Sequence, residues 1–254
     1  MTYTAQELAT LSGDKEYKQA PVGGQYYDTI TLGKDGKFYL AYYSQPKNER
    51  KDPDTLGDSV TLTILKIRRK LSKWENNAQV LESVEYDAGV ETVPTTQGDL
   101  SEKDAKARGA KVALVLYCLL NGTTVKLTVT GGSLYNPDDL DDMRLYTYLQ
   151  LFEEDEHTFM YETRIGAKVN TYVFDGVEKT NYQMTFKRGT SHTNLDAVGS
   201  ALVVLPATLE ENDARDLKWL GSSKPAPSYA ETAQKAGKPI EYPSDEINPS
   251  DIPF

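Results

Sequence analysis

The sequence has almost none of the residues that build redox and metal sites. It contains one cysteine, Cys118, and two histidines, His157 and His192, which stand in unrelated contexts. A single cysteine excludes an internal disulfide framework and a thiolate cluster. Neither histidine has a cysteine or carboxylate at metal-ligand spacing. We therefore predict a cytoplasmic protein that uses no metal or other cofactor.

Motifs for common enzymatic chemistry are also missing. The chain has no GK[ST] phosphate loop, no GxGxxG and no GxSxG, so nucleotide hydrolysis and acyl transfer lack their usual parts. The 38 acidic residues show no spacing that sets a nuclease cluster apart. No apolar run reaches the ~18 residues of a spanning helix, and none follows the N-terminus. We predict that the protein is not an enzyme and has neither a signal peptide nor a membrane segment.

The charge balance limits where the chain could bind a polyanion. The net charge is −10, of which the segment from Ser222 to Phe254 carries −2, leaving −8 for the body. Any nucleic-acid surface must then be a local basic strip on an acidic protein. The chain has seventeen tyrosines and six phenylalanines. Tyrosine suits partly exposed sheet faces, because its ring packs against apolar groups while its hydroxyl contacts water.

Turn signals and periodicity divide the chain into four parts. A capping-box pattern at Thr4 predicts a short helix near the N-terminus, and period-two segments at 26–32 and 37–43 predict strands around a turn at 34–36. Residues 45–57 are polar and predict a loop. The predicted parts are an N-terminal arm over 1–24, a barrel over 25–135, a helix and hairpin extension packed on it over 136–221, and a disordered acidic tail over 222–254.

The segment 59–74 predicts a long strand with an irregularity. Val60, Leu62 and Ile64 alternate with threonines, and the apolar positions then slip by one residue to Leu65 and Ile67. A one-residue slip moves every later side chain to the other face of a sheet. We therefore predict a β-bulge near Ile64 and Leu65.

Beyond that bulge, cations fall on one face of the predicted strand. Lys66, Arg68 and Lys70 are alternate residues that lead to Trp74, so they stand ~6.6 Å apart along one face, and Arg69 and Lys73 point the other way. That spacing suits the phosphates of an extended single strand. The alternative is a solvated face that protects a sheet edge, because lysine is commonly placed there.

Two hairpins have clear turn signals. Asn121-Gly122 joins strands over 111–120 and 123–130, and pairing outward from that turn places Tyr117 opposite Lys126 on one face. Asp175-Gly176 joins 168–174 to 177–187, which places Tyr172 opposite Lys179. The other face of this second hairpin is predicted to be core, and it carries Val169, Thr171, Val173, Tyr182, Met184 and Phe186.

Helices are predicted at three further places. Ser101 caps one that ends at Gly109. Asn136-Pro137 opens another, and the acidic cluster at 138–142 fits its first turn better than a cation site. Residues 194–205 fit either a strand or a helix, and 208–220 predict a last amphipathic helix with Leu209, Leu217 and Trp219 as contact residues.

The element order from Lys37 is three strands, a helix and two strands. This is the order of an OB-fold, a small Greek-key barrel that commonly binds oligonucleotides. We therefore predict a mainly β (α+β) fold: an OB-fold-like Greek-key barrel, extended by a helix and an extra β-hairpin, with a disordered acidic C-terminal tail.

The tail holds six of the twelve prolines and ends in Asp251-Ile252-Pro253-Phe254. An acidic tail with this ending resembles the tip of bacterial and phage single-stranded DNA-binding proteins. The resemblance implies that Asp251, Ile252, Pro253 and Phe254 dock replication or repair proteins and that the tail competes with DNA for the binding surface. It departs from the family in its thinner acidic run, Asp245-Glu246 and Asp251. It also implies a bacterial cell or a phage-infected host.

Together these observations predict sequence-independent single-stranded DNA binding in replication, recombination or repair, by a chain that could form homo-oligomers. The predicted DNA strip consists of Lys66, Arg68, Lys70, Trp74, Tyr117, Lys126, Tyr172 and Lys179. The alternative is a β-rich phage structural or assembly protein whose tyrosine-rich faces are protein interfaces.

Overall fold

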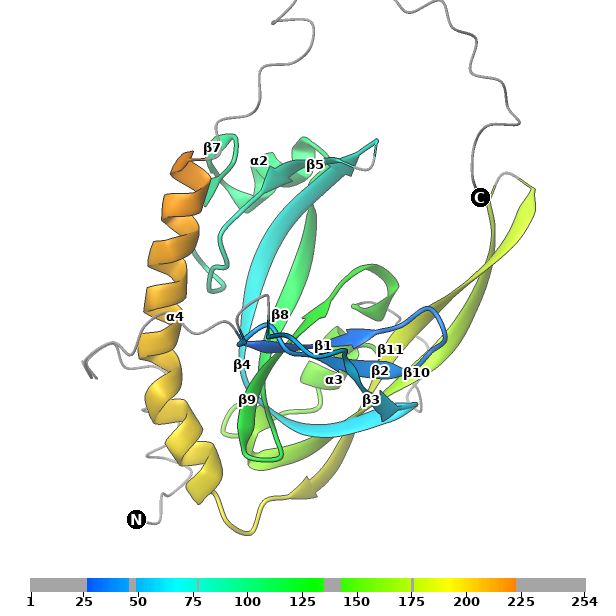
Figure 1. Cartoon of the computed structure of the whole chain (residues 1–254), viewed down its shortest axis with the longest axis vertical. Helices are drawn as coiled ribbons and strands as arrows, with labels where there is room; N and C mark the ends of the chain where they lie inside the picture. The colour runs from blue at the N-terminus through cyan, green and yellow to red at the C-terminus, as the bar shows by residue number, and fades with distance from the viewer. Residues whose placement is uncertain (1–26, 46–48, 77, 135–142, 175, 223–254) are drawn as a thin grey trace, which may run out of the picture.

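The computed structural model describes residues 27–45, 49–76, 78–134, 143–174 and 176–222 (Figure 1). The predicted N-terminal arm, the acidic cluster at 138–142 and the tail from 223 lie outside the described residues.

The fold is mainly β, as predicted. One sheet contains β1 (Asp28–Leu32), β2 (Phe38–Ala41), β3 (Asp54–Gly57), β4 (Ser59–Glu75), β5 (Ala78–Glu82), β8 (Lys111–Leu120), β9 (Thr123–Val129), β10 (Tyr161–Phe174) and β11 (Val177–Ser191). Their order is β11-β10-β4-β8-β9-β1-β2-β3, and β5 pairs with the far end of β4. All neighbours are antiparallel except β1 and β9. β10 joins β4 directly, so the predicted barrel and extension share one sheet.

The sheet curls without closing. In the described part of the chain no hydrogen-bonded pairing joins β11 to β3, so the sheet is not a closed barrel and the OB-fold stays a prediction. The predicted loop at 45–57 ends in a strand, because β3 pairs with β2. β6 (Val93–Thr95) and β7 (Gly98–Leu100) form a small separate sheet. Such strands of three or four residues are too short to show a period of two.

The long strand β4 contains the predicted bulge. Its pairing with β8 shifts register between Ile64 and Lys66. Ile64 is buried inside the curl of the sheet, whereas Leu65 is buried on the opposite face. The bulge therefore exchanges the two faces of β4, as the one-residue slip in the sequence predicts.

Both predicted hairpins have the predicted register. Tyr117 pairs with Lys126 in β8 and β9, and Tyr172 pairs with Lys179 in β10 and β11. β10 and β11 project beyond the rest of the sheet as a long hairpin, which we call the arm (Figure 1). Val169 and Val173 on the arm are 53% and 71% exposed, so the prediction that this face is core throughout is wrong. Only its base, with Met184 and Phe186, reaches the core.

The remaining helices are α2 (Glu102–Ala107), α3 (Leu145–Leu149) and α4 (Asp196–Ser222), with short 3-10 turns η1 (Gly131–Ser133) and η2 (Thr158–Met160). Ser101 caps α2 by accepting a hydrogen bond from the Asp104 backbone N–H, as predicted. The predicted start of the helix at Asn136 lies outside the described residues. Tyr148 of α3 is buried inside the curl and fills it.

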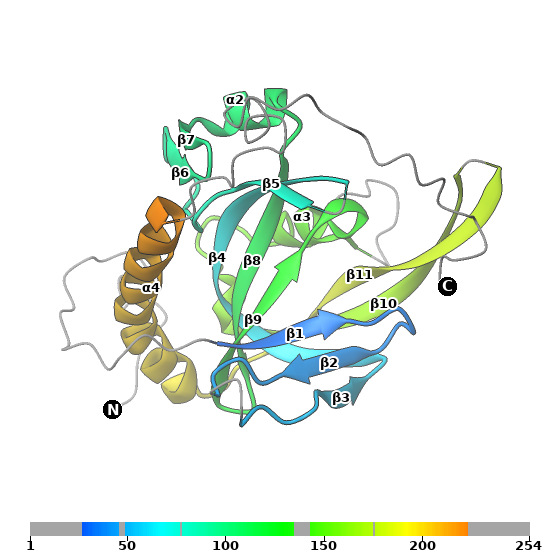
Figure 2. The same cartoon turned by 45° about the horizontal axis from the view of Figure 1, so that its top comes forward.

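The helix α4 crosses the outer face of β4 and β8 (Figures 1 and 2). Residues 196–205, part of the segment that fits either a strand or a helix in the sequence, are helical in the structure. The helix continues through Pro206, which has no N–H to donate. Its contact face repeats at helical spacing and packs on Leu65, Val115 and Tyr117: Val198, Leu202, Leu205 and Leu209. Leu217 and Trp219 are exposed, because after Leu209 the contact face becomes polar, with Asn212 and Asp213.

Candidate nucleic-acid interface

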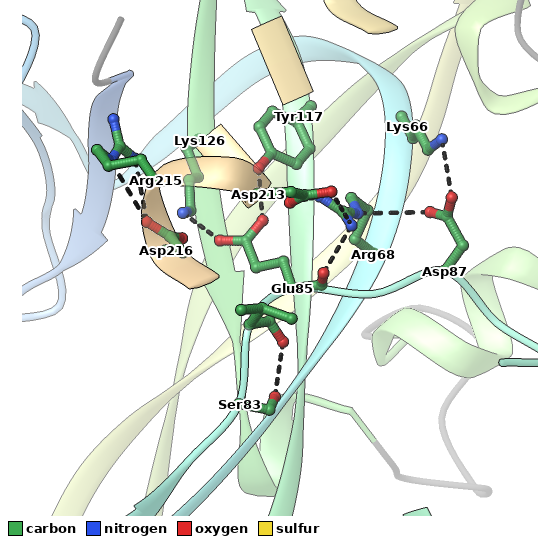
Figure 3. A network of polar contacts seen from close by, with 11 residues as sticks. Lys66, Arg68, Ser83, Glu85, Asp87, Tyr117, Lys126, Asp213, Arg215 and Asp216 are labelled. Atoms are coloured by element: carbon green, nitrogen blue, oxygen red, sulfur yellow. Dashed lines mark hydrogen bonds and ion pairs between the residues drawn. The ribbon is translucent and has the colours of Figure 1, made fainter. Parts of the chain in front are cut away.

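The cations predicted on β4 lie on one face but beneath other parts of the chain. Arg68 is 6% exposed, and Lys66 and Lys70 are partly covered. Above them pass α4 and the segment 83–87 that follows β5 (Figure 3). We call Lys66, Arg68, Lys70, Tyr117 and Lys126 the covered strip, and each of its cations has a carboxylate partner.

Arg68 is the best-partnered of these residues. Its guanidinium donates to both carboxylate oxygens of Asp213 on α4, at 2.7 and 2.9 Å, and to the carbonyl of Glu85 at 2.6 Å. Burial alone would lower the pKa of Arg68, but the Asp213 carboxylate raises it above its usual value. Burial dominates at Asp213 and raises its pKa in spite of Arg68. We assign an ionised pair at neutral pH because the contact is bidentate.

Glu85 neutralises a second part of the strip. It accepts hydrogen bonds from the Tyr117 hydroxyl, at 2.5 Å, and from the Lys126 ammonium group. Burial would raise the pKa of Glu85, but the charge of Lys126, both hydrogen bonds and Arg68 lower it below its usual value. Burial and the Glu85 charge raise the pKa of Tyr117. This carboxylate is thus held ionised between two cations.

The outer cations of the strip are paired as well. Lys66 lies 3.2 Å from an Asp87 oxygen, and Lys70 lies 2.5 Å from Glu82. Phosphates would have to displace these carboxylates before binding. The prediction that the shared face of β4 is an open phosphate path is therefore wrong for this structure, because segments far along the chain cover it with acids.

The predicted aromatic positions are also separated. Tyr117 is 2% exposed and contacts Tyr27 edge-on at 5.2 Å, so no base could stack on it. Trp74 is 62% exposed but lies at the far end of β4, beside β5. Tyr172 is 42% exposed on the arm. The structure brings Tyr117 and Lys126 together with Arg68 and keeps Tyr172 with Lys179, in a separate place.

The arm carries a cationic face that the sequence prediction recognised only in part. Because side chains alternate along a strand, the register of β10 and β11 places one set of residues together, here called the arm face: Arg164, Gly166, Lys168, Asn170, Tyr172, Lys179, Asn181, Gln183, Thr185 and Lys187. These ten described residues include four cations and no acidic residue, and the next residue of β10 on this face is Glu162. Arg164 and Lys187 pair directly, and continuing the period of two from Tyr172 and Lys179 would have found both.

The cations of the arm face are spread along the hairpin. They form rungs at Lys179, at Lys168 and at the Arg164–Lys187 pair, four residues or about 13 Å apart. The next neighbours of this face on β4 are polar, because Arg164 pairs with Thr61 and Gly166 with Ser59. Such an arrangement attracts a polyanion from solution and offers one ring for stacking.

Comparison with known proteins finds no matching family model, and no significant match among curated proteins or solved structures. Within the described residues, no group of three or more histidine, cysteine or acidic side chains could hold a metal ion. None of the helices in that part of the chain is long and apolar enough to cross a membrane.

Proposed function

We propose that this protein binds single-stranded DNA without sequence preference, on the arm face. One observation carries the proposal. On a chain with net charge −10, four cations lie among the ten described residues of the arm face, none of which is acidic. Local potential at the phosphates drives nucleic-acid binding more than net charge does.

The preference for a single strand follows from the ring and from the width of the arm. Tyr172 lies opposite Lys179, so a base stacked on the ring would bring its phosphate near a cation. In a duplex the base faces are occupied by neighbouring bases, whereas in a single strand they are open for stacking. Two strands span only ~5 Å between their axes, which suits one extended chain.

Two further parts of the proposal come from the sequence. The first is an OB-fold-like sheet, because OB-fold barrels commonly bind oligonucleotides and the sheet of this protein is curled. The tail tip, Asp251 to Phe254, would dock replication or repair proteins, as the resemblance to single-stranded DNA-binding proteins implies. In this proposal the arm face holds DNA and the tail recruits partners.

A titration tests the proposal directly. Fluorescent oligo-dT should bind more tightly than a duplex of equal length, and log Kd should rise linearly with log salt. A mixed-sequence single strand should bind within a few-fold of oligo-dT. Equal binding of duplex and single strand, or no binding at 50 mM salt, overturns it.

A second candidate, a β-rich assembly protein, is favoured by the opposite face of the arm. Val169 and Val173 are exposed there, and exposed apolar patches commonly mark protein interfaces. Light scattering at increasing protein concentration checks this alternative. It predicts a concentration-dependent oligomer that Val169→Ser with Val173→Ser dissociates, whereas oligo-dT binding would be absent.

A further inference from the structure

A cleft of about 780 Å³ lies where the curled sheet does not close. On one side are the ends of β1 and β9 with the loop around Gly131 and Gly132. On the other side is β11, the edge strand of the arm. Figure 2 shows β1 and β2 running in front of the base of the arm. The volume lies within the range of pockets that hold small molecules and cofactors.

Two contacts join the walls of the cleft. The Tyr182 ring packs so closely on Gly36 that a Cβ there would lie 2.5 Å from the ring, and Gly36 has φ +79°. The Gln183 side chain packs on Gly132, where a Cβ would lie 2.2 Å from its amide nitrogen. Two glycines therefore permit the arm to meet the body at this distance.

The lining has a distinct chemistry. Its described residues include Lys34 and no carboxylate. Ile30, Leu32 and Met184 supply apolar surface, and Tyr182 supplies a ring. The other lining residues with side chains carry hydroxyl or amide groups: Thr29, Thr31, Thr128, Thr130, Ser133, Thr180, Asn181 and Gln183. Apolar walls with a few amides and hydroxyls suit a flat heteroaromatic ring with polar edges.

The cleft is continuous with the arm face. Asn181 and Gln183 belong to both, since Asn181 pairs with Asn170 and Gln183 with Lys168. The Asn170 amide donates to Asn181 at 3.0 Å, which leaves the Asn181 amide hydrogens for a ligand. A strand lying on the arm face would thus pass the mouth of the cleft.

We infer that the cleft is a nucleotide subsite, which takes one nucleobase with its phosphate toward Lys34. The inference rests on the proposed function and adds a place where one base leaves the strand and is enclosed. Asparagine and glutamine amides hydrogen-bond base edges, and the ring of Tyr182 supplies a stacking surface. The lack of carboxylates in the lining favours an anionic ligand.

The test uses the full-length protein with dTMP, dAMP and deoxyribose 5-phosphate as probes, followed by amide chemical shifts. Both nucleotides should shift residues of the cleft saturably, and the sugar phosphate should bind about tenfold more weakly because it cannot stack. Thr128→Trp, a large substitution in the lining of the cleft, should weaken dTMP binding about tenfold. Thr123→Trp, at the exposed other end of β9, is the matched control and should change nothing.

Gly132→Ala is the second variant, because it moves the flexible Gln183 amide with no strained backbone angle at residue 132. It should weaken dTMP binding while leaving the melting temperature unchanged. Shifts confined to the arm face, or equal binding by wild type, Thr128→Trp and Gly132→Ala, overturn the inference. If oligo-dT still binds in that case, the proposed function stands without the subsite. If dTMP occupies the cleft but oligo-dT does not bind, the proposed function falls and the cleft remains a site for free nucleotides.

Discussion

The covered strip and the arm face use the same residue types to opposite effect. In the covered strip, Lys66, Arg68, Lys70 and Lys126 each meet a carboxylate. On the arm face, ten described residues share one surface, and they include four cations and no acidic residue. The difference shows that a row of cations on a strand does not by itself define a polyanion site. What covers the row decides whether its charge holds the fold together or attracts a ligand.

The largest expected effect comes from replacing Arg68, at the centre of the covered strip. Arg68→Ala leaves Asp213 and the Glu85 carbonyl without their donor, and breaking a buried pair from one side costs about 3–5 kcal/mol. Urea unfolding should show this loss in the free energy of unfolding. Arg164→Ala on the arm should cost under about 0.5 kcal/mol. Comparable losses in both variants would erase the distinction between the two regions.

Reversing the charge of the arm face should act on binding instead of stability. Replacing Lys168, Lys179 and Lys187 together with glutamate should weaken oligo-dT binding about a hundredfold at low salt and reduce the slope of log Kd against log salt by about 2. The control reverses Lys103, Lys111 and Lys218, which are exposed elsewhere, and gives the same net charge. If the control weakens binding as much, the arm face is not the site.

One tyrosine in each region should respond differently to substitution. Tyr172→Ala should cost about 1–3 kcal/mol of oligo-dT binding, because bases stack on exposed rings, and it should leave the melting temperature unchanged. Tyr117→Phe removes the hydroxyl that donates to Glu85 and should lower stability by about 1–3 kcal/mol without changing the affinity of the folded protein. Fluorescence titration and thermal melting of both variants separate these effects. The reverse pattern would make the covered strip the binding surface.

The smallest effect concerns pH. The pKa of Glu85 in the folded protein lies below its usual value of 4.5, since Lys126, Tyr117 and Arg68 outweigh its burial. A lowered folded pKa contributes stability that is fully present above the usual pKa and is lost as pH falls through the folded one. The difference in unfolding free energy between wild type and Glu85→Gln should therefore be largest near pH 7 and should shrink below about pH 4.5. An unchanged difference from pH 7 to pH 3, with exposed Glu91→Gln as control, would contradict this assignment.

Local chemistry in the sequence was sufficient for much of the fold. The turn at Asn121-Gly122 set the register of β8 and β9, Asp175-Gly176 set that of β10 and β11, and the apolar slip at Ile64 placed the bulge. These features depend on neighbours within a few residues, so a period of two and turn geometry predict them. The same period placed Lys66, Arg68 and Lys70 on one face.

The surroundings of that face depend on residues far along the chain. Asp213 stands 145 residues from Arg68 along the chain, and Glu85 stands 41 residues from Lys126. No periodicity within β4 carries information about such partners, because the path of α4 depends on where its apolar residues find a surface to cover. Alternation along the chain is enough to establish which residues share a strand face. The packing of α4 and of residues 83–87 placed the cationic face of β4 in the interior, whereas no helix of the described structure covers the arm (Figure 1).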